Sequence, residues 1–207
     1  MSTTTAGGLG QSILSLVRSL DPERFEVSVA FGPGYPLDQA FMESGLRIFP
    51  IRLRRGLKLM NVAGFWDLFR LLRKERFDIV HAHSSEAGVL GRLAAKITGV
   101  PVVFFTLHGY ASLNYHSAFS RSFLWVVEKL MDTCTHHYVA VSGYVEKIWL
   151  QRGIVSPDRV SVIYNGVDPD AIPRPTDPAV MRTRIGLPAG DSVVGSAALL
   201  EPRKGME

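Results

Sequence analysis

The sequence has little cysteine and no long hydrophobic run. Among its 207 residues Cys134 is the single cysteine, which excludes a disulfide framework, fits a reducing compartment and is expected to be a buried structural thiol. No basic start followed by an apolar stretch indicates a signal peptide, and no uninterrupted apolar run of about 18 residues indicates a transmembrane helix. We therefore expect a cytoplasmic protein, at most peripheral on the inner face of a membrane.

The usual nucleotide-binding motifs are missing as well. Gly7 and Gly8 run into an amphipathic helical pattern, but the segment AGGLGQS is not G-x-G-x-x-G, and G-x-x-x-x-G-K-[ST] does not occur in the sequence. From the residues alone, the glycine pair fits a plain tight turn or a loop that brings backbone close to a phosphate.

Acidic residues are scarce in one region. Lys and Arg (23) outnumber Asp and Glu (19), which gives a net charge of +4. Within residues 47–76 the acids are Asp67 and Glu75, whereas the bases are Arg47, Arg52, Arg54, Arg55, Lys58, Arg70, Arg73, Lys74 and Arg76. Such a region fits an anionic lipid surface, a phosphorylated substrate or nucleic acid, and equally well an ordinary solvated face.

The sequence does contain a regular alternation of strand and helix patterns. Strands are predicted at residues 24–32, 45–53, 77–84, 101–109, 137–142 and 160–166. Helices are predicted between them at residues 61–76, 86–99, 120–133 and 143–153, with Asn61 and Ser85 as N-caps. Residues 77–84 and 101–109 are almost continuously apolar, which is typical of strands buried on both faces. This order predicts an α/β fold, a Rossmann-like doubly wound and mostly parallel sheet with helices on both faces.

The composition changes after Asp168. Residues 169–178 are rich in proline, as in a linker, a short helix is expected at 179–185, and residues 192–207 have the pattern of a new strand and loop. We divide the chain into a first domain at residues 1–168, a linker with a short helix at 169–191, and the truncated start of a second domain at 192–207.

Two of the predicted helices carry aromatic residues whose role is open. Phe65, Trp66 and Phe69 lie beside Arg70, Arg73 and Lys74, a combination that suits interfacial membrane binding but also the core face of a helix that covers a sheet. We favour the core. In the helix at 120–133 one face is formed by Phe123, Val126, Val127 and Leu130.

Candidate site residues follow from the predicted strands, because open parallel sheets bind ligands at the carboxyl ends of their strands. The polar residues and glycines that fall there are Gly7, Gly8, His81, His83, Ser84, His108, Gly109, Ser142, Asn165 and Gly166. His108, which ends an apolar strand and precedes glycine, is the best single candidate, although a structural histidine is the alternative.

Two of these candidates have simpler explanations. His81 and His83 alternate on a strand and point to one face, so they could bind a metal, but no further ligand is evident and a packing or site-lining role is favoured. Ser142 could cap the helix that follows it.

Several segments, in this order and spacing, resemble the N-terminal half of retaining GT-B glycosyltransferases: AGGLGQSILSLVRSL, FDIVHAHS, GVPVVFFTLHG, YVAVSGYV and VSVIYNGVD. The closest group is the family-4-like, group 1 set, with sucrose-synthase-like enzymes and capsule, exopolysaccharide and phosphatidylinositol mannosyltransferases. The resemblance covers nearly the whole chain, and TLHG with YNGVD is specific only as a pair. It implies two Rossmann-like domains, the acceptor held by the first and the nucleotide-sugar by the second.

The resemblance also implies roles for individual residues. Gly7 and Gly8 match the glycine pair that approaches the donor diphosphate, and His108 matches the histidine that contacts the transferred sugar. Lys204 matches the lysine that binds the diphosphate, where its charge offsets that of the leaving group. The remaining donor- or substrate-binding candidates are His83, Ser84, Gly109, Ser142, Asn165, Gly166 and Arg203.

The implied activity is hexosyl transfer, with retention, from a nucleotide-sugar to a glycan or lipid-linked acceptor in cell-surface polysaccharide or glycolipid biosynthesis. No metal, no further cofactor and no nucleic acid is expected. Peripheral membrane contact would use residues 47–76. The alternatives are a non-catalytic binding or membrane-docking subunit that needs a separate donor-binding chain, and a GT-B nucleotide-sugar epimerase.

Three departures from the family pattern bear on activity. Leu199 replaces the usual arginine before Lys204, so Arg203 is expected to bind the donor phosphate instead. The paired glutamates of the second domain are absent, and only MSTTT stands where the hydrophobic first strand is expected. We therefore expect a fragment, without its first strand, that does not transfer sugar by itself.

Overall fold

The computed structural model describes residues 8–32, 41–53, 61–109, 117–167, 169, 177–188, 190 and 192–195. The chain separates into two compact units, residues 1–167 and residues 168–207. In the second unit the described residues contain one short helix, α7 (Pro178–Arg184), which Asp177 caps by accepting a hydrogen bond from the Ala179 amide. The predicted strand at the start of the second domain is not formed at residues 192–195, and the rest of that segment lies outside the described residues.

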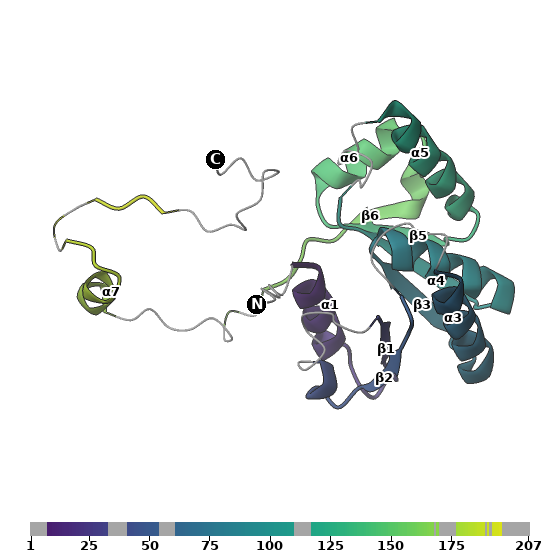
Figure 1. Ribbon diagram of the computed structural model, residues 1–207, viewed down its shortest axis with the longest axis horizontal. Helices are drawn as coiled ribbons and strands as arrows, with labels where there is room; N and C mark the ends of the chain where they lie inside the picture. The colour runs from purple at the N-terminus through teal and green to yellow at the C-terminus, as the bar shows by residue number, and fades with distance from the viewer. Residues whose placement is uncertain are drawn as a thin grey trace. The chain divides into compact units, whose positions relative to one another are not determined.

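The main feature of the first unit is a four-stranded parallel sheet (Figure 1). Its strands follow chain order as β3 (Ile79–His83), β4 (Val102–Leu107), β5 (His137–Ala140) and β6 (Val160–Val162). The connections are α4 (Ser85–Thr98), α5 (Ala118–Asp132) and α6 (Gly143–Gln151), the last followed by a 3-10 turn, η3 (Pro157–Arg159). The α/β class and the parallel arrangement predicted from the sequence are confirmed.

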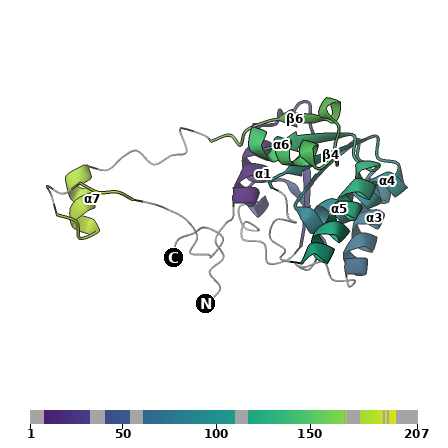
Figure 2. The ribbon, with the colours of Figure 1, turned by 90° about the horizontal axis from the view of Figure 1, so that it is seen from above.

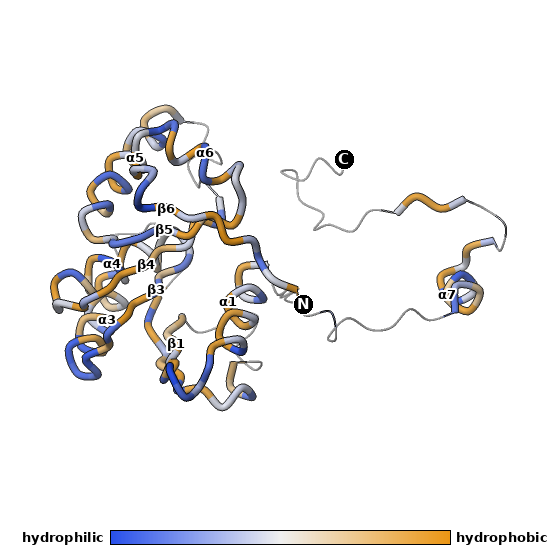
Figure 3. The backbone as a smooth tube through the Cα atoms, turned by 180° about the vertical axis from the view of Figure 1, so that it is seen from behind, coloured by the Kyte–Doolittle hydropathy of each residue, from blue (hydrophilic) through white to orange (hydrophobic). Residues whose placement is uncertain are grey.

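One face of this sheet forms the main core. Its residues alternate along each strand, as the pleat requires: Ala82, Val103, Phe105, Leu107, Tyr138, Ala140 and Val160. Trp149 of α6 and Ala94 and Ala95 of α4 pack in the same clusters. The hydrophobic stretches through β3 and β4 are visible in Figure 3.

The opposite face of the same sheet is polar and aromatic. The strand register places His81, Phe104 and His137 in one row, and His83, Thr106, Val139 and Ser161 in the next. His137 Nε2 and Ser161 Oγ are 2.9 Å apart. Three of the six histidines of the chain, His81, His83 and His137, therefore lie on one face of this sheet.

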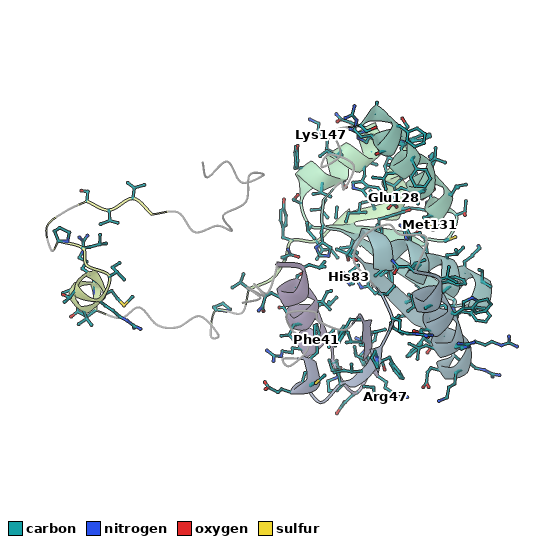
Figure 4. The ribbon with its side chains drawn as sticks, viewed as in Figure 1. Phe41, Arg47, His83, Glu128, Met131 and Lys147 are labelled. Carbon is teal, nitrogen blue, oxygen red and sulfur yellow. The ribbon has the colours of Figure 1, made fainter. Side chains whose placement is uncertain are left out.

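A second, smaller parallel sheet contains β1 (Ser28–Phe31) and β2 (Arg47–Pro50). The helix α1 (Gly8–Ser19) packs on it through Leu14, which contacts Phe41 in a small cluster. Figure 4 labels Phe41 beside α1. Among the described residues no strand joins β1 or β2 to the four-stranded sheet.

The helix α3 (Val62–Glu75) links the two parts, since its Leu68 and Leu72 pack with Ile51, after β2, and with Val103 of β4. In Figure 1, α4 lies between α3 and α5, and it contacts both helices. Figure 2 shows these three helices together on one side of the first unit.

Three local expectations were wrong or only partly right. The strand β3 is the edge of its sheet, with Ile79 43% exposed, so it is not buried on both faces. The helix α4 already includes Ser85, and Ser84 occupies its N-cap position. Asn61 stands at the N-cap of α3 but its side chain makes no capping hydrogen bond.

The apolar face predicted on α5 is largely exposed. Phe123, Val126 and Leu130 are 52%, 46% and 60% exposed, whereas the side chains that α5 buries are Leu124 and Glu128. Glu128 is buried because it pairs with Arg92 of α4 at 2.7 Å, and Arg92 is completely buried over the ring of Phe105.

Candidate functional site

The carboxyl edge of the four-stranded sheet brings two predicted site residues into contact. His83 is the last residue of β3, and His108 follows the last residue of β4. The register pairs His83 with Thr106, so His108 lies just beyond it on the neighbouring strand. His83 Nδ1 and His108 Nε2 are 3.1 Å apart, a hydrogen bond between two imidazoles. Figure 4 labels His83 at this place.

The histidines of this cluster are held neutral. Burial, with smaller contributions from the charges of His81 and His108, lowers the pKa of His83 to about 2. Burial and the charge of His108 lower the pKa of His81 to about 4, and burial lowers the pKa of His108. At neutral pH each ring therefore offers one donor and one acceptor nitrogen and carries no charge.

His81 completes the cluster from inside the sheet. Its Nε2 lies 2.7 Å from Oγ1 of the buried Thr106, and its ring centroid lies 4.3 Å from that of His83. The alternation of His81 and His83 on one face, which the sequence predicted, is confirmed, since their register partners Phe104 and Thr106 alternate with the core residues of β4.

The loop that carries His108 is anchored at its backbone. The indole Nε1 of Trp149 donates a hydrogen bond of 3.1 Å to the carbonyl oxygen of Gly109. Trp149 belongs to α6 and is 3% exposed, so the anchor is part of the main core. A buried donor needs a partner, and the chain supplies it from the residue next to His108.

The turn after His83 is strained. Ser84 has φ 67° and ψ 160°, a backbone region that is almost restricted to glycine and costs on the order of 1–3 kcal/mol for other residues. Its carbonyl accepts a hydrogen bond from the Gly88 amide and so begins α4. The predicted site residue Ser84 thus lies at a tight turn between the strand and the helix.

Ser142, Asn165 and Gly166 follow the next two strands of the same edge. The amide before Ser142, that of Val141, donates to the carbonyl of Leu107 at 3.3 Å, which joins this turn to the base of the His108 loop. The Ser142 hydroxyl accepts a hydrogen bond from the Val145 amide, so the capping role considered above is observed. Asn165 and Gly166 come after β6 and are exposed.

Most of the candidate residues for donor binding lie outside the described residues. Gly8 is exposed and is the first residue of α1, whereas Gly7, Arg203 and Lys204 lie outside the described residues. In the part of the chain that is described, no group of three or more His, Cys, Asp or Glu could hold a metal ion, and no helix is long and apolar enough to cross a membrane.

The basic region of residues 47–76 is partly neutralised within the protein. Arg47 pairs with Glu75 at 2.8 Å and with Glu26 at 3.2 Å, and Arg52 pairs with Asp67 at 2.6 Å. Arg70, Arg73 and Arg76 are exposed and form no ion pair with another of the described residues. Residues 54–60, which include Arg54, Arg55 and Lys58, lie outside the described residues.

Two residues of the site were not found from the sequence. Thr106 sits in an apolar strand, and its alternation with Phe104 was the only available signal. Trp149 lies forty residues after Gly109 in the chain, so no local pattern could connect them.

Comparison with known proteins supports one assignment. Residues 6–171 match glycosyltransferase family 4. A UDP-Gal:alpha-D-GlcNAc-diphosphoundecaprenol alpha-1,3-galactosyltransferase of Escherichia coli is 33% identical over 151 residues, which cover 72% of this chain and 39% of that protein. A D-inositol 3-phosphate glycosyltransferase of Acidothermus cellulolyticus is 32% identical over 135 residues, 62% of this chain and 30% of that protein.

Solved structures agree in fold. Anabaena HepE, crystallised with UDP and glucose, superposes with a TM-score of 0.67 at 17% identity. The matched region covers 90% of this chain and 49% of the HepE chain. A glycosyltransferase from Rickettsia africae gives a TM-score of 0.65 at 18% identity. The matched region covers 91% of this chain and 48% of the Rickettsia chain. The chain thus spans about half or less of the length of the proteins it matches. By sequence, it belongs to glycosyltransferase family 4.

Proposed function

We propose that this chain is the acceptor-side domain of a retaining glycosyltransferase, which moves a hexosyl group from a nucleotide-sugar to a glycan or lipid-linked acceptor. Two similar proteins support this proposal. The Escherichia coli relative is a galactosyltransferase that uses UDP-Gal and a diphosphoundecaprenol-linked sugar, and HepE was crystallised with UDP and glucose. A relative from a capsule biosynthesis system, from Staphylococcus aureus, supports a role in surface polysaccharide synthesis.

The observation that carries the proposal is the neutral His108 at the carboxyl edge of the sheet. Ligands of parallel α/β sheets bind at this edge. An imidazole whose pKa is lowered by burial stays uncharged at neutral pH, so it can hydrogen-bond a sugar hydroxyl as donor or acceptor. We assign His108 the contact with the transferred sugar.

The donor diphosphate is assigned to a different set of groups. Gly7 and Gly8, where α1 begins, would bring backbone amides close to the phosphates, and a helix N-terminus favours such anions. Lys204 and Arg203 would offset the charge that develops on the leaving diphosphate. The proposal requires no metal ion.

The test is substitution of His108 in a chain that continues through a donor-binding domain. We expect His108→Ala to lower the transfer rate by about 100-fold while leaving the thermal unfolding temperature nearly unchanged. The matched control is His137→Ala, which removes a histidine from the same face of the sheet at the amino end of β5. Equal rates for the two variants would contradict the role of His108.

A second proposal concerns peripheral contact with the inner face of an anionic membrane. The helices α3 and α5 expose apolar side chains, among them Val62 (58%), Trp66 (46%) and Phe119 (81%). Arg70 and Arg73 are exposed on α3, whose acids Asp67 and Glu75 are both paired with arginine. Aromatic residues beside exposed arginines suit the headgroup region of an anionic bilayer.

Co-sedimentation with vesicles tests this contact. We expect binding to vesicles that contain phosphatidylglycerol, weaker binding at high salt, and a several-fold loss in the variant Phe119→Ser with Phe123→Ser. The control is Tyr144→Ser, which removes an equally exposed aromatic residue from α6. Absence of binding at every salt concentration would contradict the proposal.

A further inference from the structure

The strongest unassigned feature is the contact between the two imidazoles at the carboxyl edge. We infer that His83 is a positioning residue, which fixes the tautomer and the ring orientation of His108 through the hydrogen bond between His83 Nδ1 and His108 Nε2. The consequence for catalysis rests on the proposed function, but the positioning itself does not.

The argument begins with the number of protons in the pair. Both rings are neutral, because burial disfavours their charged forms. Two neutral imidazoles that meet at 3.1 Å share one hydrogen between the facing nitrogens, so one ring donates and the other accepts. The tautomers of His83 and His108 are therefore coupled, and the protonation of His108 Nδ1 depends on which ring donates.

The two histidines are not equally constrained. His83 belongs to β3, is paired in register with Thr106, and lies against His81 with ring centroids 4.3 Å apart and ring planes tilted by 32°. His108 lies beyond the end of β4, and in the described part of the chain its ring has one hydrogen-bond partner, His83. The fixed ring is thus His83, and the ring whose orientation it determines is His108.

The backbone on the far side of His108 is fixed separately. Trp149 holds the carbonyl of Gly109, and the Val141 amide holds the carbonyl of Leu107. Because both neighbours of His108 are anchored, the principal freedom left to this residue is rotation of its side chain and exchange of its ring proton. The contact with His83 restrains both.

The arrangement also determines which atom can meet a substrate. His108 Nε2 is occupied by His83, so Nδ1 is the ring nitrogen that remains for a sugar hydroxyl. A single tautomer gives Nδ1 one defined role, as donor or as acceptor, and a mixture would give it both. Positioning by a neighbouring residue is the usual means by which a histidine acquires such a role.

The test is nitrogen NMR of the imidazoles in the 207-residue chain labelled with 15N. Long-range proton–nitrogen correlation distinguishes the two neutral tautomers, and His108 is assigned by the loss of its signals in His108→Ala. We expect a single tautomer of His108 in the wild type. In His83→Phe, which keeps a ring of similar size without nitrogen, we expect shifts that average the two tautomers.

Two further variants make the test independent of a general disturbance. His83→Asn places an amide near the position of Nδ1, and we expect it to restore a single tautomer of His108. His137→Phe replaces a histidine on the same face that does not contact His108, and we expect no change. If His83→Phe fails to fold, the reciprocal measurement is the tautomer of His83 in His108→Ala. The nitrogen shifts of His83 must then change, because its hydrogen-bond partner is gone.

The inference is overturned if His108 keeps its tautomer in His83→Phe, or if the wild-type signals are already averaged. Its failure can be distinguished from failure of the proposed function. In a chain that transfers sugar, His83→Phe should lower kcat by about 10-fold or more and His83→Asn should recover most of it. If the tautomer of His108 changes in His83→Phe as expected but kcat is unchanged, the positioning by His83 stands and the role of His108 in transfer is contradicted.

Discussion

The two parallel sheets of the first unit differ in how they are stabilised. The four-stranded sheet contributes to two large clusters that bury Val103, Leu107, Tyr138 and Ile154 almost completely. The two-stranded sheet has a cluster whose buried members are Leu14 and Phe41, surrounded by half-exposed side chains. Because burial of apolar area provides most of the stabilisation, the four-stranded sheet is the stable half of this unit.

The chemical groups are divided in the same way. No histidine occurs in residues 8–53, whereas His81, His83 and His108 lie together on the stable sheet. A site that must hold a side chain within a fraction of an ångström benefits from a rigid support. The candidate site is therefore built on the more extensively buried of the two sheets.

The largest effect is expected from removal of the buried ion pair between Arg92 and Glu128. Arg92→Ala leaves Glu128 buried without its partner and deletes hydrogen bonds to Gly88 and Thr135. We expect the free energy of unfolding to fall by about 3–5 kcal/mol in urea denaturation. The control is Arg52→Ala, which breaks an exposed pair with Asp67 and should cost about 0–1 kcal/mol. Similar losses in both variants would refute the contrast.

The next prediction compares the same substitution in the two sheets. Leu107→Ala, at 1% exposure in the main core, should lower the free energy of unfolding by roughly 3–5 kcal/mol. Leu14→Ala, at 5% exposure in the small cluster, should cost about 2 kcal/mol, because its half-exposed neighbours can close around the gap. Urea denaturation measures both. A larger loss for Leu14→Ala would reverse the proposed order of the two halves.

Acid should act on the histidine-bearing sheet. In the folded protein the pKa of His81 is lowered to about 4 and that of His83 to about 2, so below pH 6.5 the unfolded chain binds more protons than the folded one. The stabilisation is complete above pH 6.5 and decreases as the pH falls, by about 1.4 kcal/mol per pH unit for each histidine.

Urea denaturation at pH 7.5 and pH 5.0 measures this loss. We expect roughly 2 kcal/mol for each of the two histidines at pH 5.0, and a smaller loss in His83→Asn, which has no proton to bind. A wild-type stability that is the same at both pH values would be incompatible with neutral buried histidines.

The smallest effect concerns two glycines of α4. A methyl group at Gly88 would lie 2.5 Å from the ring of Phe105, so Gly88→Ala should cost about 1–3 kcal/mol through overpacking. At Gly91 the nearest atom is the Cβ of Ala82 at 3.8 Å, so Gly91→Ala should gain up to about 1 kcal/mol from helix propensity. Thermal denaturation distinguishes the signs, and equal signs would contradict this description of the helix packing.

The sequence predicted the alternation of strands and helices along the chain and placed His83 and His108 at the carboxyl ends of strands, because periodicity and strand length are local properties. It did not predict that β3 lies at an edge, since residues 77–84 were interpreted as an apolar run although His81 and His83 are two of the five residues of β3. The exposure of Phe123 and Leu130 was equally inaccessible, because an amphipathic pattern does not say which surface, if any, covers it.

Contacts between distant residues were also beyond reach. The N-cap of α4 is a local feature that was also missed: Ser84 occupies it without a capping hydrogen bond to its side chain, so the capping preference of Ser85 was no guide. The hydrogen bond from Trp149 to Gly109 depends on the packing of α6 against β4 and β5.

That hydrogen bond gives the protein an optical signal of its own. The chain has 3 tryptophans, of which Trp66 and Trp125 are 46% and 38% exposed, whereas Trp149 is 3% exposed. The indole emission that comes from the apolar interior therefore belongs to Trp149. Its Nε1 donates a hydrogen bond to the carbonyl oxygen of Gly109, the residue after His108. With Trp66 and Trp125 replaced by phenylalanine, the fluorescence of the remaining indole would report directly on whatever enters or displaces the His108 loop.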